Sequence, residues 1–440
     1  MLEHLKSLMR KELLQTRNVP ASEGDVSQTI VARQPIFDKD DKIWGYELLY
    51  RSAQNTQTAE ISSGAVATAS VIINGFEAVR PSVKKTQKIL INFTSAMLTA
   101  QASTLLPPEM CVVEILEDVE PTPDIMEAVA AIKEAGYLIA VDDYIGQDNL
   151  LPFLPLADIL KVDVLELTPK ELATQMVRIR GSKFAGTLLA EKVENQKSLA
   201  LCRGLGFSLF QGFFFSKPEV IHGKKVSTSR AMRMQILALC ASDEINIRAI
   251  SDAILHDPLI TANLLKFINS SHFGLREKVR SVQHALAIVG PAIFMQWLCV
   301  SVLATMENSR ISSEVAFLAS IRGKFLESLG RGLIERDALP PDLSVPALFL
   351  AGLFSLLESI MHMPFSEILK GIPLDPNVLM ALQGHESPYR PWLWLVEFHE
   401  HGEWEQCMKI AQQLNLSESD IAVAYAKALQ WSSAFFGETQ

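Results

Sequence analysis

The chain has 440 residues, of which 48% are hydrophobic and 20% are charged, and its formal net charge is −10. This composition excludes an intrinsically disordered chain, and the length allows two or more domains with complete cores. The acidic balance disfavours a binder of nucleic-acid polymers, because contacts with the phosphate backbone depend on Lys and Arg. A small anionic ligand at a local site is compatible with it.

The cysteines and the hydropathy pattern bear on the location of the protein. Five Cys residues lie far apart inside apolar runs and form no CxxC pair, which is typical of buried free thiols in a reducing compartment. No segment has the roughly 20 apolar residues that cross a bilayer, and the N-terminus lacks the uninterrupted apolar core of a signal peptide. We therefore expect a cytoplasmic protein without a membrane span.

Residues 1–28 form the first expected segment. Over residues 1–17, leucines and Met9 recur at helical spacing with basic residues on the opposite side. This pattern predicts a helix that packs on its own protein or, as the alternative, lies on a membrane surface. Residues 18–28 contain Pro20, Gly24 and small polar residues, and they predict a linker.

From Thr29 onwards, short apolar runs alternate with longer helical segments. The expected helices cover residues 64–79, 124–135, 170–180 and 196–205, and the expected strands are Ile30–Arg33, Trp44–Leu49, Ile89–Phe93, Val112–Leu116, Tyr137–Val141, Ile159–Val162, Thr187–Ala190 and Ser208–Phe210. Strand and helix in alternation indicate a parallel sheet, and eight such units predict a closed (β/α)8 barrel. In that fold the chemistry lies at the carboxyl ends of the strands.

Most of the expected strands end at a polar residue. At Asp142-Asp143 two adjacent carboxylates repel each other unless a cation lies between them, although a cap of the next helix is an alternative reading. The other polar ends are Glu47, Asn92, Glu114, Lys161, Glu191 and Gln211. Hard cations such as Mg²⁺ take oxygen ligands, and a two-metal site needs several carboxylates. We therefore predict a divalent-metal site in which Lys161 supplies a fixed positive charge.

The second half of the chain is expected to be helical. Ser216–Arg230 is rich in Ser, Lys and turn residues and marks the clearest domain boundary. Asp257 is expected to cap a helix that begins with a proline, Ser281 a second helix, and Ser417 forms a capping-box pattern with Asp420. We predict an N-terminal helix and linker at 1–28, a barrel domain at 29–218, a linker at 219–230 and an all-helical domain at 231–440.

Seven motifs follow one another in the first half of the chain. They are Gly45-Tyr46-Glu47-Leu48-Leu49-Tyr50-Arg51, Ile91-Asn92-Phe93-Thr94, Glu114-Ile115-Leu116-Glu117, Asp142-Asp143-Tyr144, Lys161-Val162-Asp163, Ala190-Glu191-Lys192-Val193-Glu194 and Gln211-Gly212-Phe213-Phe214-Phe215-Ser216-Lys217-Pro218. In this order they resemble the EAL family of cyclic-di-GMP phosphodiesterases, with Leu48 where the family name has Ala. The resemblance implies a modified TIM barrel.

The resemblance also implies a role for each matching residue. Ligands of a Mg²⁺ or Mn²⁺ pair would be Glu47, Asn92, Glu114, Asp142, Asp143 and Glu191. Lys161 would lie beside the hydrolytic water, with Glu47 and Glu191 as its catalytic partners. Arg51 would hold a phosphate through its planar guanidinium, Gln211 would close the far side, and Glu117 would anchor the loop after Asp143. The implied reaction is in-line hydrolysis of one phosphodiester of cyclic-di-GMP, which gives linear pGpG.

The loop after the paired acids departs from the family pattern. The family usually has Asp-Asp-Phe-Gly-Thr-Gly, whereas this chain has Asp142-Asp143-Tyr144-Ile145-Gly146-Gln147 and fewer residues before Lys161. In the family this loop shapes the second metal position and a dimer contact. The sequence therefore decides neither whether the barrel hydrolyses the nucleotide nor whether the protein forms a homodimer. The expected functions are an active phosphodiesterase or, alternatively, an inactive cyclic-di-GMP sensor or a protein-interaction scaffold.

The helical half resembles the HDOD domain, a relative of the metal-dependent HD hydrolases that lacks their metal ligands. The matching residues are 257–270, the helix after Ser281, and Gln296-Trp297-Leu298. Together with Val31-Ala32-Arg33-Gln34-Pro35-Ile36-Phe37 they are similar to bacterial EAL–HDOD signalling proteins, which implies a protein partner for the helical domain. His256-Asp257 is not expected to be a catalytic HD pair, because Asp257 precedes a proline and suits a helix cap.

Overall fold

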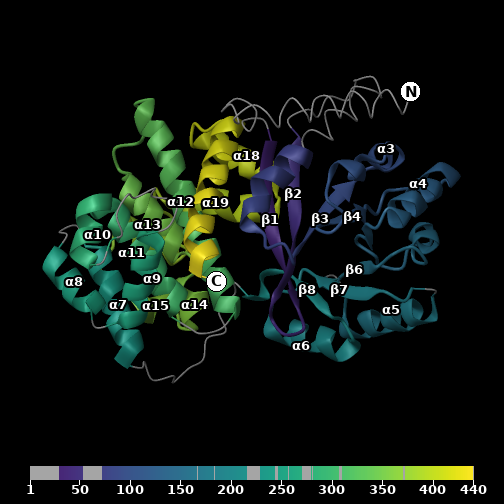
Figure 1. Cartoon of the computed structure of the whole chain (residues 1–440), viewed down its shortest axis with the longest axis horizontal. Helices are drawn as coiled ribbons and strands as arrows, with labels where there is room; N and C mark the ends of the chain where they lie inside the picture. The colour runs from purple at the N-terminus through teal and green to yellow at the C-terminus, as the bar shows by residue number, and fades with distance from the viewer. Residues whose placement is uncertain are drawn as a thin grey trace. The chain divides into compact units, whose positions relative to one another are not determined.

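The computed structural model describes residues 29–52, 72–165, 167–182, 184–215, 228–242, 246–255, 257–269, 279, 281–306, 310–369 and 372–439. The expected helix and linker at 1–28 therefore lie outside the described residues. Contacts divide the chain into two compact units, a barrel made mostly of residues up to Phe214 and an array of helices made mostly of residues from Phe215 onwards (Figure 1).

Eight strands close into a barrel in chain order. They are β1 (Thr29–Asp38), β2 (Ile43–Ser52), β3 (Lys88–Phe93), β4 (Cys111–Ile115), β5 (Leu138–Val141), β6 (Ile159–Asp163), β7 (Thr187–Glu191) and β8 (Leu209–Gln211). All eight expected strands are confirmed. The barrel interior contains a fully apolar layer, made of Ile36, Leu90, Val112, Ala140, Ile159, Leu189 and Leu209.

The expectation of a parallel sheet is wrong for the first strand. β1 is antiparallel to both β2 and β8, whereas the neighbours from β2 to β8 are parallel. The reason is the connection: a parallel pair needs a crossover of about a dozen residues or more, but only residues 39–42 separate β1 from β2. Asp38 closes this turn, because its carboxylate accepts hydrogen bonds from the backbone N–H of Asp40 and Lys42. Figure 1 shows the two long strands side by side.

Helices cover the outside of the barrel between its strands. They are α3 (Ser95–Thr99), α4 (Pro123–Glu134), α5 (Pro169–Gly181) and α6 (Gln196–Leu205), in addition to the helical residues 72–79. Thr122, Thr168 and Asn195 cap α4, α5 and α6 with their side chains, and Glu171 completes a capping box with Thr168. Between β5 and β6 the chain forms a short 3₁₀ helix, η4 (Asp148–Phe153), instead of an α-helix.

The second unit is built from helices alone in its described part. They are α7 (Thr228–Cys240), α8 (Ile247–Leu255), α9 (Pro258–Ile268), α10 (Val282–Val289), α11 (Pro291–Thr305), α12 (Arg310–Glu335), α13 (Val345–Phe354), α14 (Leu357–Met361), α15 (Phe365–Ile368), α16 (Pro376–Leu382), α17 (Arg390–His401), α18 (Trp404–Gln413) and α19 (Glu418–Thr439). The long helix α12 packs against α13 and α19.

The helix caps expected in this unit are confirmed. The Asp257 carboxylate accepts hydrogen bonds from two backbone N–H groups of α9, and Ser281 accepts one from α10. Ser417 and Asp420 exchange the reciprocal bonds of a capping box. Trp431 stacks on Trp297 in the core, with ring centroids 3.8 Å apart. Among the helices of the described ranges, none is long and apolar enough to cross a membrane.

Candidate functional site

The site is a second layer of side chains on top of the apolar layer of the barrel. Successive side chains of a strand point to opposite faces, so a residue two positions after an inward apolar residue also points inward. Two positions after members of the apolar layer stand Asn92, Glu114, Asp142, Lys161, Glu191 and Gln211. On β2 the small Gly45 lies level with the apolar layer, beside Ile36, and Glu47 follows two positions later. The register thus brings the polar residues to one end of the barrel.

Lys161 lies at the centre of this layer. Its ammonium is bonded to Glu114 of β4 and lies 3.3 Å from Glu47 of β2. The distances to Asp142 and Glu191 are 2.8 and 2.9 Å. The lysine side chain is 1% exposed, and a buried ammonium is costly unless carboxylates surround it. Four carboxylates around one ammonium leave an excess of negative charge, which suits a further cation.

Burial and charge set the protonation of this cluster. Burial raises the pKa values of Glu114 and Glu191 well above the usual range, and the nearby Lys161 only partly offsets it. Burial also acts to raise the pKa of Asp142, but the charge and hydrogen bond of Lys161 outweigh it and the pKa is lowered. Burial would lower the pKa of Lys161, yet its four carboxylates raise it well above the ordinary value. A divalent cation that bound these acids would therefore displace protons.

Four buried oxygen atoms in this layer are open to a further partner. They have no hydrogen-bond partner among the described residues, and they are Oδ1 of Asn92, Oε2 of Glu114, Oε2 of Glu191 and Oε1 of Gln211. Buried polar atoms are normally paired, so each such atom needs an explanation. Carboxylate and amide oxygens are the ligands that Mg²⁺ and Mn²⁺ prefer. The residues present therefore fit a divalent cation.

A second group of acids lies beside the first and shares one member with it. Carboxylate oxygens of Glu117, Asp142 and Asp143 lie within 4.8 Å of one another. Asp143 has a left-handed backbone, with φ of 41°, and its N–H donates to the Asp142 carboxylate at 2.9 Å. Burial and the charge of Asp142 raise the pKa of Asp143. Since Asp142 belongs to both groups, the geometry offers two neighbouring cation positions.

The divergent loop after these acids is held by its own side chains. Gln147 accepts a hydrogen bond from the N–H of Ile145 and donates one to the carbonyl of Asp143, both at 2.8 Å. Asn149 donates to the backbone carbonyl of Glu117 at 3.2 Å. Glu117 is thus tied to this loop through its backbone, while its carboxylate faces the paired acids.

Residues of β1, β2 and β8 complete the site. Gln211 donates hydrogen bonds to Glu47 at 2.6 Å and to Gln34 of β1 at 2.5 Å, which fixes the Glu47 carboxylate. Tyr50 donates to the carbonyl of Asn92 at 2.8 Å, and burial raises its pKa to about 12, so it stays protonated. Arg51 is four positions beyond Glu47 and on the same face of β2.

Three residues of this region lie in motifs of the sequence but received no site role from it. Gln34 contacts the site only because β1 is antiparallel to β2. Asp163 lies on the same face of β6 as Lys161, a signal that the sequence contained. Lys192, directly after β7, forms ion pairs with Asp163 and Asp143, and no local pattern indicated them.

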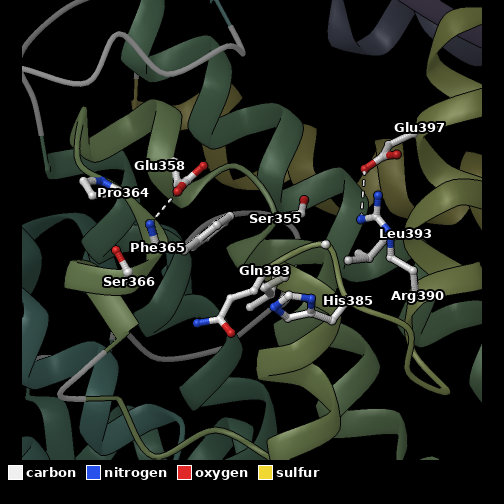
Figure 2. A pocket seen from close by; sticks show the side chains of 12 residues that line it. Ser355, Glu358, Pro364, Phe365, Ser366, Gln383, His385, Arg390, Leu393 and Glu397 are labelled. Atoms are coloured by element: carbon white, nitrogen blue, oxygen red, sulfur yellow. Dashed lines mark hydrogen bonds and ion pairs between the residues drawn. The ribbon is translucent and has the colours of Figure 1, made fainter.

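The helical unit contains a separate cleft of about 650 Å³. In Figure 2, Glu358 and Phe365 lie on one side of this cleft, and Arg390 and Glu397 lie on the other. These charges are engaged locally: Glu358 accepts a hydrogen bond from the N–H of Phe365, and Arg390 lies 3.9 Å from Glu397. The lining residues of the cleft therefore lack the buried, converging oxygens of the barrel.

Comparisons with known proteins give matches to the helical unit and to nearly the whole chain. A family model for the HDOD domain matches residues 227–346. The uncharacterized protein YuxH of Bacillus subtilis (strain 168) is 33% identical over 415 residues, which are 92% of this chain and 98% of YuxH. The chain belongs to the family of EAL–HDOD proteins.

Two further similarities extend over large parts of this EAL–HDOD protein. The cyclic di-GMP phosphodiesterase CdgJ of Vibrio cholerae serotype O1 is 29% identical over 418 residues, which are 93% of this chain and 94% of CdgJ. YkuI of Bacillus subtilis has an EAL domain and was solved with cyclic-di-GMP and calcium. It is 16% identical, covers 63% of this chain and 72% of its own, and has a TM-score of 0.36.

Proposed function

We propose that this EAL–HDOD protein binds cyclic-di-GMP in its barrel and hydrolyses one phosphodiester to give pGpG, with two divalent cations, Mg²⁺ or Mn²⁺. The observation that carries the proposal is the convergence of Glu47, Glu114, Asp142 and Glu191 on one buried ammonium. Such a concentration of buried charge contributes little to the stability of a fold, so it indicates a functional site. The full-length similarity to the phosphodiesterase CdgJ supports the same reaction.

Each residue of the site receives a role from its chemistry. Ligands of the two cations would be Glu47, Asn92, Glu114, Glu117, Asp142, Asp143 and Glu191. When bound, the cations supply an activated water and neutralise the developing phosphate charge. Lys161 holds the acids together and stabilises an anionic oxygen, while Gln211 and Gln34 orient Glu47. Arg51 would hold a phosphate of the nucleotide through two parallel N–H groups.

The alternative is a sensor that binds the nucleotide without cutting it. The divergent loop after Asp143 favours this alternative, because Gln147 puts a side chain at a position where the family has glycine. In either case the HDOD region would transmit the nucleotide signal to a protein partner in the cytoplasm, and the protein would act as a homodimer if the loop still pairs. We propose a barrel domain at 29–218 and a helical domain at 231–440, joined by a linker at 219–230, although the last three residues of this linker already belong to α7.

Incubation of the full-length protein with cyclic-di-GMP and Mg²⁺ or Mn²⁺, followed by chromatography, tests the proposal. We expect pGpG from the wild type and a loss of about 10- to 100-fold or more in rate in Glu47→Ala and Glu191→Gln, because losing a metal ligand costs at least as much as losing a residue that supports one. Glu134→Gln, which removes an exposed carboxylate from α4, is the matched control and should be unchanged. Nucleotide binding without pGpG would support the sensor. Undiminished hydrolysis in both site variants would falsify the metal assignment.

A further inference from the structure

Lys192 links the group of Glu117, Asp142 and Asp143 to a further carboxylate, that of Asp163. It follows β7 directly, and its ammonium is hydrogen-bonded to Asp163 of β6 and lies 3.9 Å from Asp143. Asp163 is buried, with a side chain that is 8% exposed, whereas the side chain of Lys192 is 51% exposed. The ammonium thus pairs with one buried carboxylate and lies near one partly exposed carboxylate.

The backbone of Lys192 has a conformation that residues with a side chain rarely adopt. Its φ is 53°, in the left-handed region, which glycine enters without steric cost. The following residue, Val193, fixes this turn, because its N–H donates to the carbonyl of Gln211 on β8 at 2.9 Å. A glycine would therefore be the unstrained choice here. A lysine at this place points a permanent charge at the acids.

The charge of Lys192 acts on the same carboxylate as a cation would. Asp143 belongs to the group Glu117, Asp142 and Asp143, whose oxygens suit a divalent ion. The ammonium of Lys192 is paired with Asp163 and lies near Asp143, and a lysine with such partners carries its charge at neutral pH. Two positive charges at one carboxylate repel each other at short range.

We propose that Lys192 is an internal competitor for the second cation, at the group of Glu117, Asp142 and Asp143. This inference rests on the proposed function, because it assumes that the barrel takes divalent cations. The acids around Lys161 bind one cation tightly, and the second cation binds weakly until the ammonium leaves Asp143 and Asp163. The half-exposed side chain can turn into water, so the competition weakens the second site without closing it. The barrel therefore holds nucleotide without cutting it at low metal concentration, and cuts it when the concentration rises.

Titration of the full-length protein with Mn²⁺ tests this competition. Calorimetry, together with electron paramagnetic resonance of free Mn²⁺, gives two dissociation constants for the wild type. Lys192→Gln removes the charge and keeps a polar but shorter side chain, whereas Lys192→Gly also removes the backbone strain. In both variants we expect the second dissociation constant to fall about tenfold, less than full Coulomb repulsion predicts, because the ammonium is half exposed. The first constant should fall less than the second, because Asp143 is the one proposed cation ligand that the ammonium is seen to contact among the described residues.

A matched control separates this effect from that of net charge. Lys197→Gln removes one exposed charge from α6 and should leave both constants unchanged. Mn²⁺ binding with an unaltered second constant in Lys192→Gln and Lys192→Gly overturns the competition alone. An equal fall in Lys197→Gln overturns it as well. Absence of any Mn²⁺ binding in the wild type and all variants overturns the proposed function and the competition together.

Discussion

In the barrel, one ammonium holds together carboxylates that the chain delivers from four different strand positions. Lys161 is fully paired, and its partners compensate the cost of its burial. Buried ion pairs are poor stabilisers, since an apolar cluster of the same volume is often as good or better. The same barrel uses such an apolar cluster one layer below. The charged layer is therefore better explained by the cations that it is proposed to bind than by a gain in stability.

A second buried titratable residue, His399 of α17, lies in the helical unit and makes stability depend on pH. Its ring lies among Phe325, Trp404 and Tyr425, at centroid distances of 5.1, 5.5 and 4.5 Å. Neither ring nitrogen has a hydrogen-bond partner within the described ranges. Burial lowers the pKa of His399 to about 3, from 6.5 in the unfolded chain. The folded protein therefore keeps this imidazole neutral over a range in which the unfolded chain takes up a proton.

This difference predicts a loss of stability in acid. Above pH 6.5 His399 is neutral in both the folded and the unfolded state, so it does not change the free energy of unfolding. Between pH 6.5 and pH 3 only the unfolded chain takes up a proton at this residue, and the free energy of unfolding falls by about 1.4 kcal/mol per pH unit. His399→Phe should remove this slope and leave the stability at pH 7.5 the same or higher, because two unpaired buried nitrogens disappear. Urea unfolding between pH 4.5 and 7.5 measures it, with the exposed His284→Phe as control. Parallel pH curves for wild type and His399→Phe would contradict the assignment.

At the scale of elements, the hairpin of β1 and β2 gives the barrel its unusual first strand. The turn at residues 39–42 forces β1 to run against β2, and β8 closes the barrel on β1. This direction brings Gln34 opposite Glu47 and lets Gln211 bridge the two. A local turn therefore decides which side chain supports a proposed metal ligand.

The turn after β8 is a second element on which the site depends. Gly212 has a φ of 138°, and a Cβ there would lie 2.3 Å from the backbone N of Val193. Gly212→Ala should therefore destabilise the barrel by about 2 to 4 kcal/mol and weaken Mn²⁺ binding, because Gln211 and its bond to Glu47 must shift. Gly204→Ala in α6, where nothing lies within 4 Å, should instead be neutral or stabilise by up to about 1 kcal/mol. Thermal unfolding of both variants checks this, and equal stability of the two would count against the turn.

At the scale of the whole molecule, the two compact units differ in their chemistry. The first carries the acids that suit a cation, and the second is held by apolar contacts between helices, with charged groups such as Glu327, which is paired, and Asp257, which caps a helix. Only a unit that binds a ligand is stabilised by it, by about 2.7 kcal/mol at a concentration 100 times the dissociation constant.

Scanning calorimetry with and without Mn²⁺ measures this difference. We expect two transitions, of which Mn²⁺ raises the melting temperature of one and leaves the other within about 1 °C. Glu191→Gln should abolish the increase. A single transition that shifts as a whole would show that the units unfold together.

The sequence by itself determined the eight strands, the helix caps and the identity of most site residues. These features are local: alternation with period two, a capping side chain three positions from its N–H partner, and motifs of a few residues. The turn that makes β1 antiparallel is also local, at residues 39–42, but the prediction of a parallel sheet did not include it.

Only the tertiary structure decided which of these residues meet. Lys161 and Glu47 are 114 positions apart, and Gln211 and Glu47 are 164 positions apart. The structure alone also shows that buried oxygens around Lys161 lack hydrogen-bond partners within the described residues. It alone shows that the ammonium of Lys192 pairs with Asp163 and lies near Asp143. Such distances follow from strand register and barrel closure, which depend on the packing of the whole apolar layer and are not encoded in any short stretch of the chain.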